Sequence, residues 1–202
     1  MKRLVAITTF FLMVPLFAYN QELTGLDFVS PFHEGLAAVQ KGNAWGFINT
    51  EGALVVDFRR DLVLKEMDGR SYPVFSSGRC LIREEREGIL YFGYIDRTGT
   101  AVLEPQFLNA THFNDGLAIV LKLYRNVLGQ NDLLDKYMVD YSYGELAINP
   151  DGETIHYLFE DPTHVTLSRD FMDGPPAIRS VMLSRNLFAV RSKDHKWSLK
   201  KV

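Results

Sequence analysis

A degenerate internal repeat dominates this sequence. One unit begins at Phe32 with F-H-E-G-L-A-A-V and continues with W-G-F-I-N-T-E-G and A-L-V-V-D-F. Related runs begin at Phe75 (F-S-S-G-R-C-L-I, F-G-Y-I-D-R-T-G, T-A-V-L-E-P-Q-F) and at Phe113 (F-N-D-G-L-A-I-V, E-L-A-I-N-P-D-G, E-T-I-H-Y), so the starts lie 43 and 38 residues apart. Such self-similarity indicates supersecondary units that must stack to bury their apolar faces.

Each unit is predicted to be a meander of three antiparallel strands. A glycine follows the first Phe by three residues, where a turn with positive φ would lead into the first strand. The runs L-A-A-V, R-C-L-I and L-A-I-V have the composition of short strands. A second turn closes on another glycine before the third strand. The glycines in question are Gly35, Gly78 and Gly116 for the first turn, and Gly52, Gly99 and Gly152 for the second.

The repeat decays toward the C-terminus. Phe92 and Glu145 occupy the position of Trp45, and Leu146 replaces the glycine that follows it. We expect a fourth start at Phe171 (F-M-D-G-P-P-A-I), and the segment N-L-F-A-V-R-S-K-D-H-K-W-S-L-K-K resembles the apolar and Trp-containing halves without the closing glycine. The predicted fold is an all-β domain over 19–202, with units at about 26–70, 71–110 and 111–160 and a degenerate cap at 161–202.

An insertion, Leu121–Asp140, interrupts the third unit, and two structures are open for it. Asn131 could cap a short helix over Asp132–Met138. An elongated hairpin turning at Leu128–Asn131 explains the sequence equally well. Insertions in repeat arrays gather on one face and often carry specific function, although this one could simply cover an edge of the core.

The pattern F-x-x-G-L-A-x-V, followed by W-G-[YF]-I-[DN]-x-x-G and a strand with P-x-[FY], resembles the WG-repeat family. The resemblance covers most of residues 26–157 and is strongest in Phe32–Gly52 and Phe92–Phe113. It implies a β-repeat fold with a binding or scaffold role in a bacterial, often exported, protein. The family has no shared catalytic motif to transfer.

The N-terminal stretch predicts export. Lys2 and Arg3 precede an apolar run from Leu4 to Phe17, which ends at Ala18 before the sequence turns polar, as in a signal peptide. The run is shorter than the ~20 residues of a spanning helix, so we expect cleavage near Ala18 and no stable membrane span afterwards. Secretion or residence in the periplasm follows. The remaining 20 basic and 25 acidic residues argue against a nucleic-acid partner.

Searches for catalytic and ligand-binding chemistry yield little. The common motifs of nucleotide-binding proteins and hydrolases are missing, so we predict no catalytic residues, no metal and no cofactor. Cys80, the single cysteine, lies in an apolar strand-like run and is predicted to be a small buried hydrophobe. His156, Glu160, Asp161 and His164 could be drawn as a metal site, but polar turn residues explain them better. His33 and His112 are predicted to be exposed turn histidines.

Aromatic residues are the remaining candidates for binding. Trp45, Phe47, Phe92 and Tyr94 could stack between hairpins as core, which is the favoured reading, or leave ring faces open to a sugar or peptide. Tyr124 and Tyr137 in the insertion complete the list of candidate binding residues. Near the C-terminus, Arg191, Lys193, Lys196, Lys200 and Lys201 are opposed only by Asp194. A lysine-bearing edge strand is favoured there over a basic binding tail.

The sequence therefore predicts an exported, non-enzymatic repeat domain that serves as a protein-interaction or scaffold module of the bacterial cell envelope. A cell-surface glycan-binding module is the alternative, because the W-x-[YF]-[IL]-[ND]-x-x-G hairpins are also similar to choline- and glucan-binding wall repeats. A degenerate hydrolase ranks last. The identity of the envelope protein or glycan partner and the oligomeric state are left open.

Overall fold

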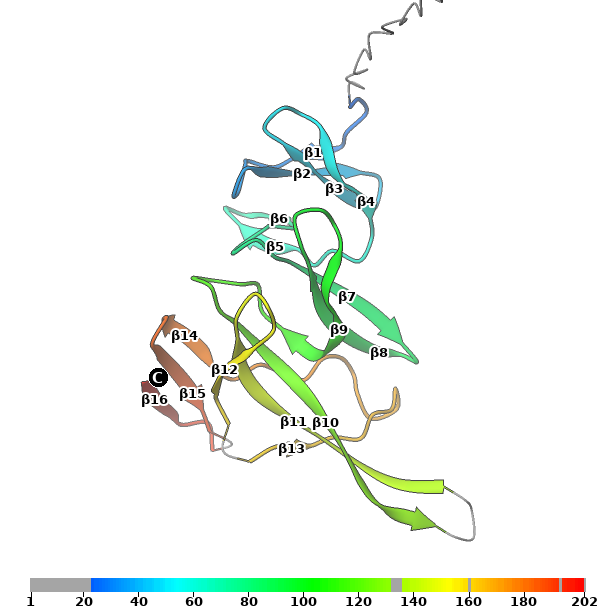
Figure 1. The fold of residues 1–202 in the computed structure, drawn as a ribbon, viewed down its shortest axis with the longest axis vertical. Helices are drawn as coiled ribbons and strands as arrows, with labels where there is room; N and C mark the ends of the chain where they lie inside the picture. The colour runs from blue at the N-terminus through cyan, green and yellow to red at the C-terminus, as the bar shows by residue number, and fades with distance from the viewer. Residues whose placement is uncertain (1–22, 132–135, 160, 193, 202) are drawn as a thin grey trace, which may run out of the picture.

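The structure is a computed structural model that describes residues 23–131, 136–159, 161–192 and 194–201. The predicted signal peptide at 1–18 lies outside these residues. The described part is built from antiparallel strands and contains no α-helix, in agreement with the predicted all-β class. The N-terminal sheet stands at one end of an elongated array, and the C-terminal cap lies beside the other end (Figure 1).

Four strands form the sheet of unit 1, in the order β1-β2-β3-β4. They are β1 Phe28–Val29, β2 Leu36–Lys41, β3 Ala44–Asn49 and β4 Leu54–Arg59. A hairpin of β5 Lys65–Met67 and β6 Arg70–Tyr72 follows. The segment between β4 and β5 also pairs with unit 2, because the Val63 N–H donates to the Leu81 carbonyl at 3.0 Å.

Units 2 and 3 share one sheet instead of forming two separate meanders. It contains β7 Cys80–Arg86, β8 Ile89–Ile95, β9 Ala101–Ala110, β10 Ala118–Asn131, β11 Lys136–Ile148 and β12 Thr154–Tyr157, and β13 Thr163–His164 also pairs with β11. Long β9 joins the units, since Phe107 pairs with Phe92 on one side and Lys122 on the other. The cap is a separate three-stranded sheet of β14 Val181–Ser184, β15 Leu187–Arg191 and β16 Trp197–Lys201.

The glycine of each F-x-x-G run adopts the positive φ that the sequence predicts. Gly35, Gly78 and Gly116 have φ values of 76°, 71° and 78°, and the residue before each glycine is also at positive φ. Two central residues at positive φ define a type I′ turn, the tight hairpin turn that matches strand twist. We call these three turns the entry turns.

Side chains tie each entry turn to the next. The Glu34 carboxylate accepts from the backbone N–H groups of Ser77 and Gly78 at 2.7 and 2.9 Å. The Ser77 hydroxyl in turn accepts from the Gly116 N–H at 3.1 Å. The residue before the glycine therefore has a second role, because it sets the spacing between neighbouring units.

The hydrophobic core lies between units, as stacking requires. The Phe at the start of unit 2, Phe75, packs its ring against Phe47 of unit 1 with centroids 4.6 Å apart. Phe113 makes the equivalent contact with Tyr94 at 4.7 Å. Phe75 and Phe113 are 2% and 1% exposed, whereas Phe32, which has no described unit before it, is 51% exposed.

The glycine of the Trp-Gly pair is required by close approach of the third strand. A Cβ on Gly46 would lie 2.8 Å from the Val56 carbonyl oxygen, and one on Gly93 would lie 2.3 Å from that of Leu103. Both glycines sit where a bulge shifts the pairing register. In unit 3 the pairing is regular at this point, and Leu146 faces Tyr157 directly. Unit 3 consequently accepts a large side chain there.

The insertion is a hairpin, so the predicted helix over 132–138 is wrong for the part of it that the structure describes. Val127 pairs with Val139, and Gly129 pairs with Met138 past a bulge. The predicted turn at Leu128–Asn131 is also misplaced, because these residues belong to β10. Residues 132–135, which connect the strands, lie outside the described part. Cross-strand pairing outweighs the weak local helix signal, since the hairpin continues the ladder of a sheet already formed.

The fourth unit does not begin at Phe171, which is 76% exposed, and Gly174 has a φ of 140° instead of an entry-turn value. Trp197 also differs from expectation because it lies in the third strand of the cap. Phe188 stands at the position of Trp45, since each lies seven residues before the last residue of an equivalent turn, His195 or Gly52. The turn that precedes the third strand of the cap forms without a glycine. His195 adopts a φ of 62° and its N–H donates to the Ser192 carbonyl, as the Gly52 N–H does to Asn49.

Candidate interaction surface

Four of the six candidate aromatic residues lie in the core. Trp45, Phe47, Phe92 and Tyr94 are 8% exposed or less. Trp45 contacts Phe28 edge to face at 5.7 Å, and the Tyr94 hydroxyl donates to the Thr111 carbonyl at 2.6 Å. Their ring faces are covered by neighbouring units, so these four do not form an open binding surface.

The other two candidates lie on the hairpin of β10 and β11, which projects well beyond the rest of the array (Figure 1). Tyr124 is half-buried near its base, where its ring lies 6.3 Å from Phe159. Tyr137 is 63% exposed near its end. The structure therefore separates the predicted set into core residues and hairpin residues.

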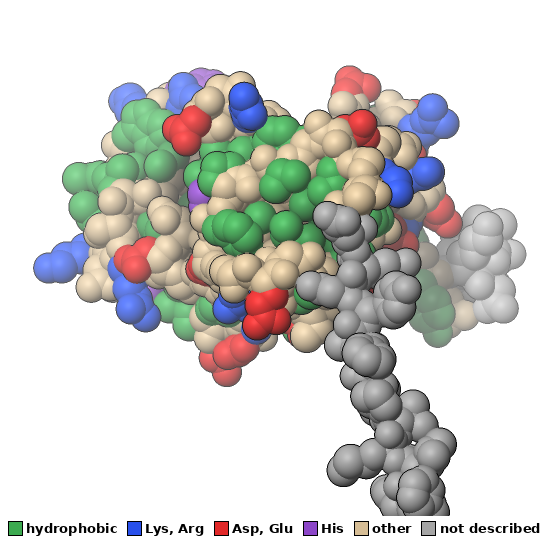
Figure 2. All heavy atoms as spheres, turned by 90° about the horizontal axis from the view of Figure 1, so that it is seen from above, with side chains coloured by type: hydrophobic (Ala, Val, Ile, Leu, Met, Phe, Trp, Pro, Cys, Tyr) green, Lys and Arg blue, Asp and Glu red, His purple; other side chains and the backbone are tan. Residues whose placement is uncertain are grey.

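The outer part of the hairpin carries a group of exposed apolar side chains, which we call the hairpin tip. Leu128 is 68% exposed, and Val127, Tyr137 and Met138 are 51%, 63% and 53% exposed. A single exposed apolar residue needs no explanation, but four on one projecting element are unusual for a protein surface. By contrast, the view down onto the N-terminal end shows acidic and basic side chains interspersed with hydrophobic ones (Figure 2).

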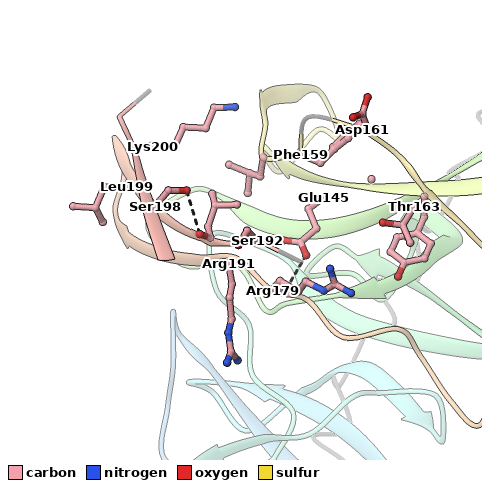
Figure 3. A pocket seen from close by; sticks show the side chains of 14 residues that line it. Glu145, Phe159, Asp161, Thr163, Arg179, Arg191, Ser192, Ser198, Leu199 and Lys200 are labelled. Carbon is pink, nitrogen blue, oxygen red and sulfur yellow. Dashed lines mark hydrogen bonds between the residues drawn. The ribbon is translucent and has the colours of Figure 1, made fainter. Parts of the chain in front are cut away.

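A groove of about 600 Å³ lies at the base of the hairpin, between β11, the segment after β12 and the cap (Figure 3). Gly144 allows one wall of it, because a Cβ there would lie 2.3 Å from the Phe159 ring. The lining is Tyr143, Gly144, Glu145, Leu158, Phe159, Asp161, Thr163, Arg179, Val190, Arg191, Ser192, Ser198, Leu199 and Lys200.

Glu145 connects unit 3 to the cap. Its side chain is 8% exposed, and its carboxylate accepts from the backbone N–H groups of Arg179 and Ser180 at 2.7 and 2.9 Å (Figure 3). In unit 1 the same position holds Trp45, which stabilises the stack through apolar contact. Unit 3 thus uses a charged acceptor for the same purpose. From the sequence, Glu145 is recognised only as a departure from the tryptophan of unit 1, although an acid inside an apolar strand is itself a signal of buried hydrogen bonding.

Two of the cations around the groove, Lys200 and Arg191, interact with other parts of the protein. The Lys200 ammonium donates to the Tyr157 carbonyl at 2.5 Å. The Arg191 side chain turns away from Glu145 in Figure 3, and its guanidinium lies 5.7 Å from the Trp197 ring centroid. The described lining residues include no histidine or cysteine, so a base or nucleophile of these types is not among them.

The histidines considered as ligands lie in separate environments. His164 pairs with Asp140 at 2.6 Å, whereas His156 faces the ring of Phe188. In the described residues no group of three His, Cys, Asp or Glu side chains could hold a metal ion, and Glu160 lies outside that part.

His112 differs from its prediction as an exposed turn residue. It is largely buried, and burial, together with the charge of Lys65, lowers the pKa of its imidazole to about 4. His33 instead lies beside Tyr72, with its Nε2 3.2 Å from the Tyr72 hydroxyl. Cys80 agrees with its prediction because it is completely buried, which raises the pKa of its thiol to about 12.

Among the residues that the structure describes, none forms a helix long and apolar enough to cross a bilayer. The WG containing repeat family model matches residues 26–43, 45–59 and 92–123. The first two stretches cover the strands of unit 1. The third begins at Phe92 in unit 2, includes the entry turn of unit 3, and ends within the first part of β10. Searches of curated proteins and of solved structures returned no match. The chain therefore carries repeats of the WG containing repeat family at these three stretches, and the stacked meanders and entry turns agree with that assignment.

Proposed function

We propose that this chain is an exported, non-enzymatic protein-interaction or scaffold module of the bacterial cell envelope, and that the hairpin tip is its docking element. The observation that carries the proposal is the exposure of Val127, Leu128, Tyr137 and Met138 on a hairpin that projects from the array. Tyrosine and methionine are enriched in protein interfaces, and exposed valine and leucine beside them add apolar contact area.

The base of the hairpin supports this role because continuous strand pairing carries the chain out to the tip. From Ala118 to Val127, β10 pairs with β11 without a break in register, and its first part also pairs with β9. The Tyr124 and Phe159 rings pack across the base. A partner would therefore meet a preformed surface, which lowers the entropic cost of binding.

The position of the hairpin in the sequence also supports specificity. The family match ends at residue 123, so most of the hairpin lies outside the repeat pattern. Stacking requires the entry turns and the core, but it does not require residues 124–140. A segment that stacking does not need is free to serve a particular partner.

Export rests on residues 1–18, whose basic start and short apolar run are typical of a signal peptide. The test is expression of the full chain in a bacterial host, followed by fractionation and intact-mass measurement. We expect an envelope or secreted product that has lost its first 18 residues or thereabouts. A cytoplasmic product that retains Met1 would overturn the export proposal.

The docking proposal is tested by excising residues 126–140 and joining Arg125 to Tyr141 through Asn-Gly. These two residues pair directly, so a type I′ turn can close the shortened hairpin. The mature chain is used to capture proteins from envelope extract, and a captured partner is then purified and its Kd measured. We expect the excision to abolish binding while the melting temperature is maintained.

A finer comparison uses single substitutions. Leu128→Ser and Tyr137→Ser are each expected to weaken binding about tenfold or more, as loss of an interface anchor does. Phe171→Ser is the matched control, because Phe171 is 76% exposed but lies in the segment between β13 and β14, outside the two strands of the hairpin. Equal losses from Leu128→Ser and Phe171→Ser, or full binding after excision, would overturn the role of the hairpin tip. Retention of the excised chain on purified wall glycan would instead support the glycan alternative.

A further inference from the structure

The cap presents a second apolar surface, which the strand register defines. Ala189 lies directly opposite both Val181 and Leu199, so these three side chains share one face of the sheet. Arg191 opposite Trp197, and Leu187 opposite Lys201, extend the same face. Past a bulge, Ser184 lies opposite Leu187 on this face. Met182 and Phe188 lie on the other face and pack against unit 3. We call the surface of Val181, Ser184, Leu187, Ala189, Arg191, Trp197, Leu199 and Lys201 the outer face.

The described part of the chain leaves much of the outer face uncovered. Leu199 is 69% exposed, Trp197 is 55% exposed, and Val181 is 48% exposed. In unit 2 the corresponding side of the sheet is buried against unit 1, where Ile95 is fully covered. The cap is turned the opposite way, because Phe188 faces back toward unit 3. The side that a regular unit buries is therefore open to solvent here.

The outer face also has an unusual charge. Arg191 and Lys201 are its only ionisable members, and both are cations. Residues 174–201 contain seven Lys and Arg residues against one acid, Asp194, whereas the chain as a whole is acidic. An apolar, Trp-containing surface with a cationic border is complementary to the interfacial layer of an anionic membrane.

We propose that the outer face of the cap docks the protein peripherally on an anionic lipid membrane surface. Trp197 and Leu199 would enter the boundary between headgroups and acyl chains, while Arg191 and Lys201 stay at the level of the lipid phosphates. The Arg191 guanidinium lies 5.7 Å from the centroid of the Trp197 ring, so a cation stands directly beside the apolar ring that would enter the interface. This docking surface is separate from the hairpin tip.

Two other occupants fit less well. The five apolar side chains expose of the order of 400 Å², less than the ~800 Å² per partner of a standard protein interface. A second copy would also bring Arg191 and Lys201 against like charges. A membrane does not have to be complementary in shape to the outer face. The affinity of the protein for the membrane rises with each apolar group inserted and with each cation near the lipid phosphates.

The test uses the mature full chain with phosphatidylglycerol-containing vesicles and with neutral phosphatidylcholine vesicles. In a Trp45→Phe background, which places in unit 1 the residue that unit 2 has as Phe92, Trp197 is the remaining tryptophan. We expect flotation with the anionic vesicles, weakened by high salt, and a blue shift of Trp197 fluorescence. Neutral vesicles are expected to bind at least tenfold more weakly.

Substitutions then separate the outer face from the rest of the surface. Trp197→Ser combined with Leu199→Ser should reduce vesicle binding at least tenfold, and Arg191→Gln or Lys201→Gln about fivefold each at low salt. Phe171→Ser is the control and should bind normally, and Leu199→Ser alone serves if the double variant melts early. The chain with the excised hairpin should still bind vesicles, which keeps this proposal distinct from the docking role of the hairpin tip.

Three results would overturn the proposal. One is failure of the wild-type chain to float with anionic vesicles. Another is unchanged binding by the Trp197→Ser/Leu199→Ser variant. The third is absence of vesicle binding together with another interaction of the outer face. That interaction would be a concentration-dependent dimer, or binding to an acidic protein, and the same substitutions would abolish it.

Discussion

We expect Glu145 to stabilise the packing of the cap against unit 3. Its substitution measures what the carboxylate contributes to stability at the position where unit 1 has Trp45. Glu145→Ala leaves the N–H groups of Arg179 and Ser180 without the acceptor that lies 2.7 and 2.9 Å away. A hydrogen bond to a charged group contributes about 1.5–3 kcal/mol, and the two bonds share one carboxylate. We therefore expect a loss of about 3 kcal/mol in the free energy of unfolding, with a range of ~2–5 kcal/mol.

Two further variants sharpen this prediction. Glu145→Gln keeps the shape and one acceptor oxygen but loses the charge, so it should cost about half as much as Glu145→Ala. Glu51→Ala removes an exposed acid from a turn and should change stability by less than ~0.5 kcal/mol.

Urea unfolding gives the free energies, and amide hydrogen exchange followed by NMR locates the effect. In the Glu145→Ala protein, the amides of Arg179 and Ser180 should lose protection, while those of β2 and β3 stay protected because the unit 1 core is separate from the cap. Protection unchanged at both cap amides, together with a stability loss below ~0.5 kcal/mol, would refute the reasoning.

Three other predictions follow from the same stacked core. Trp45→Ala should lower the free energy of unfolding by about 3–5 kcal/mol in urea titration, and an unchanged value would show that Trp45 is not structural. Gly93→Ala should destabilise by more than ~2 kcal/mol because its Cβ would lie 2.3 Å from the Leu103 carbonyl oxygen, whereas Gly129→Ala, with no contact closer than 3.7 Å, is the matched control. Burial lowers the pKa of His112 to about 4 in the folded protein, against about 6.5 in the unfolded chain, so the unfolded chain binds more protons between these two values. The free energy of unfolding should therefore fall as the pH drops from about 6.5 to about 4, by up to ~3 kcal/mol. A His112→Gln variant should show a flatter profile in this pH window, and an identical profile would contradict the assignment.

Several structural features were readable from the sequence because they are set locally. The entry turns are the clearest case, since only glycine adopts positive φ at low cost, and Gly35, Gly78 and Gly116 recur at the same place in each unit. The burial of Cys80 followed from the apolar run around it. The role of Glu34 was not readable, because it depends on the position of Ser77 in the next unit.

The candidate interaction surface was only partly predictable. The insertion was identified as the variable segment, and Tyr124 and Tyr137 do lie on it. Its conformation was open between helix and hairpin because a short segment of mixed propensity takes its structure from what it pairs with. The sequence favours burial of Trp45, Phe47, Phe92 and Tyr94, and these residues are buried. A position that carries an aromatic residue in successive units is expected to be a stacking position.

By itself, the sequence determined that this protein is a stack of β-meanders, because the periodic glycines and apolar runs encode turns and strands within a few residues of themselves. Only the tertiary structure decided that units 2 and 3 share one sheet, that Glu145 replaces a stacking tryptophan with two hydrogen bonds, and that the cap turns its sheet back toward unit 3. Each of these depends on pairing between residues far apart in the chain. Such pairing is selected by the total burial and hydrogen bonding of the assembled core, which no local pattern specifies.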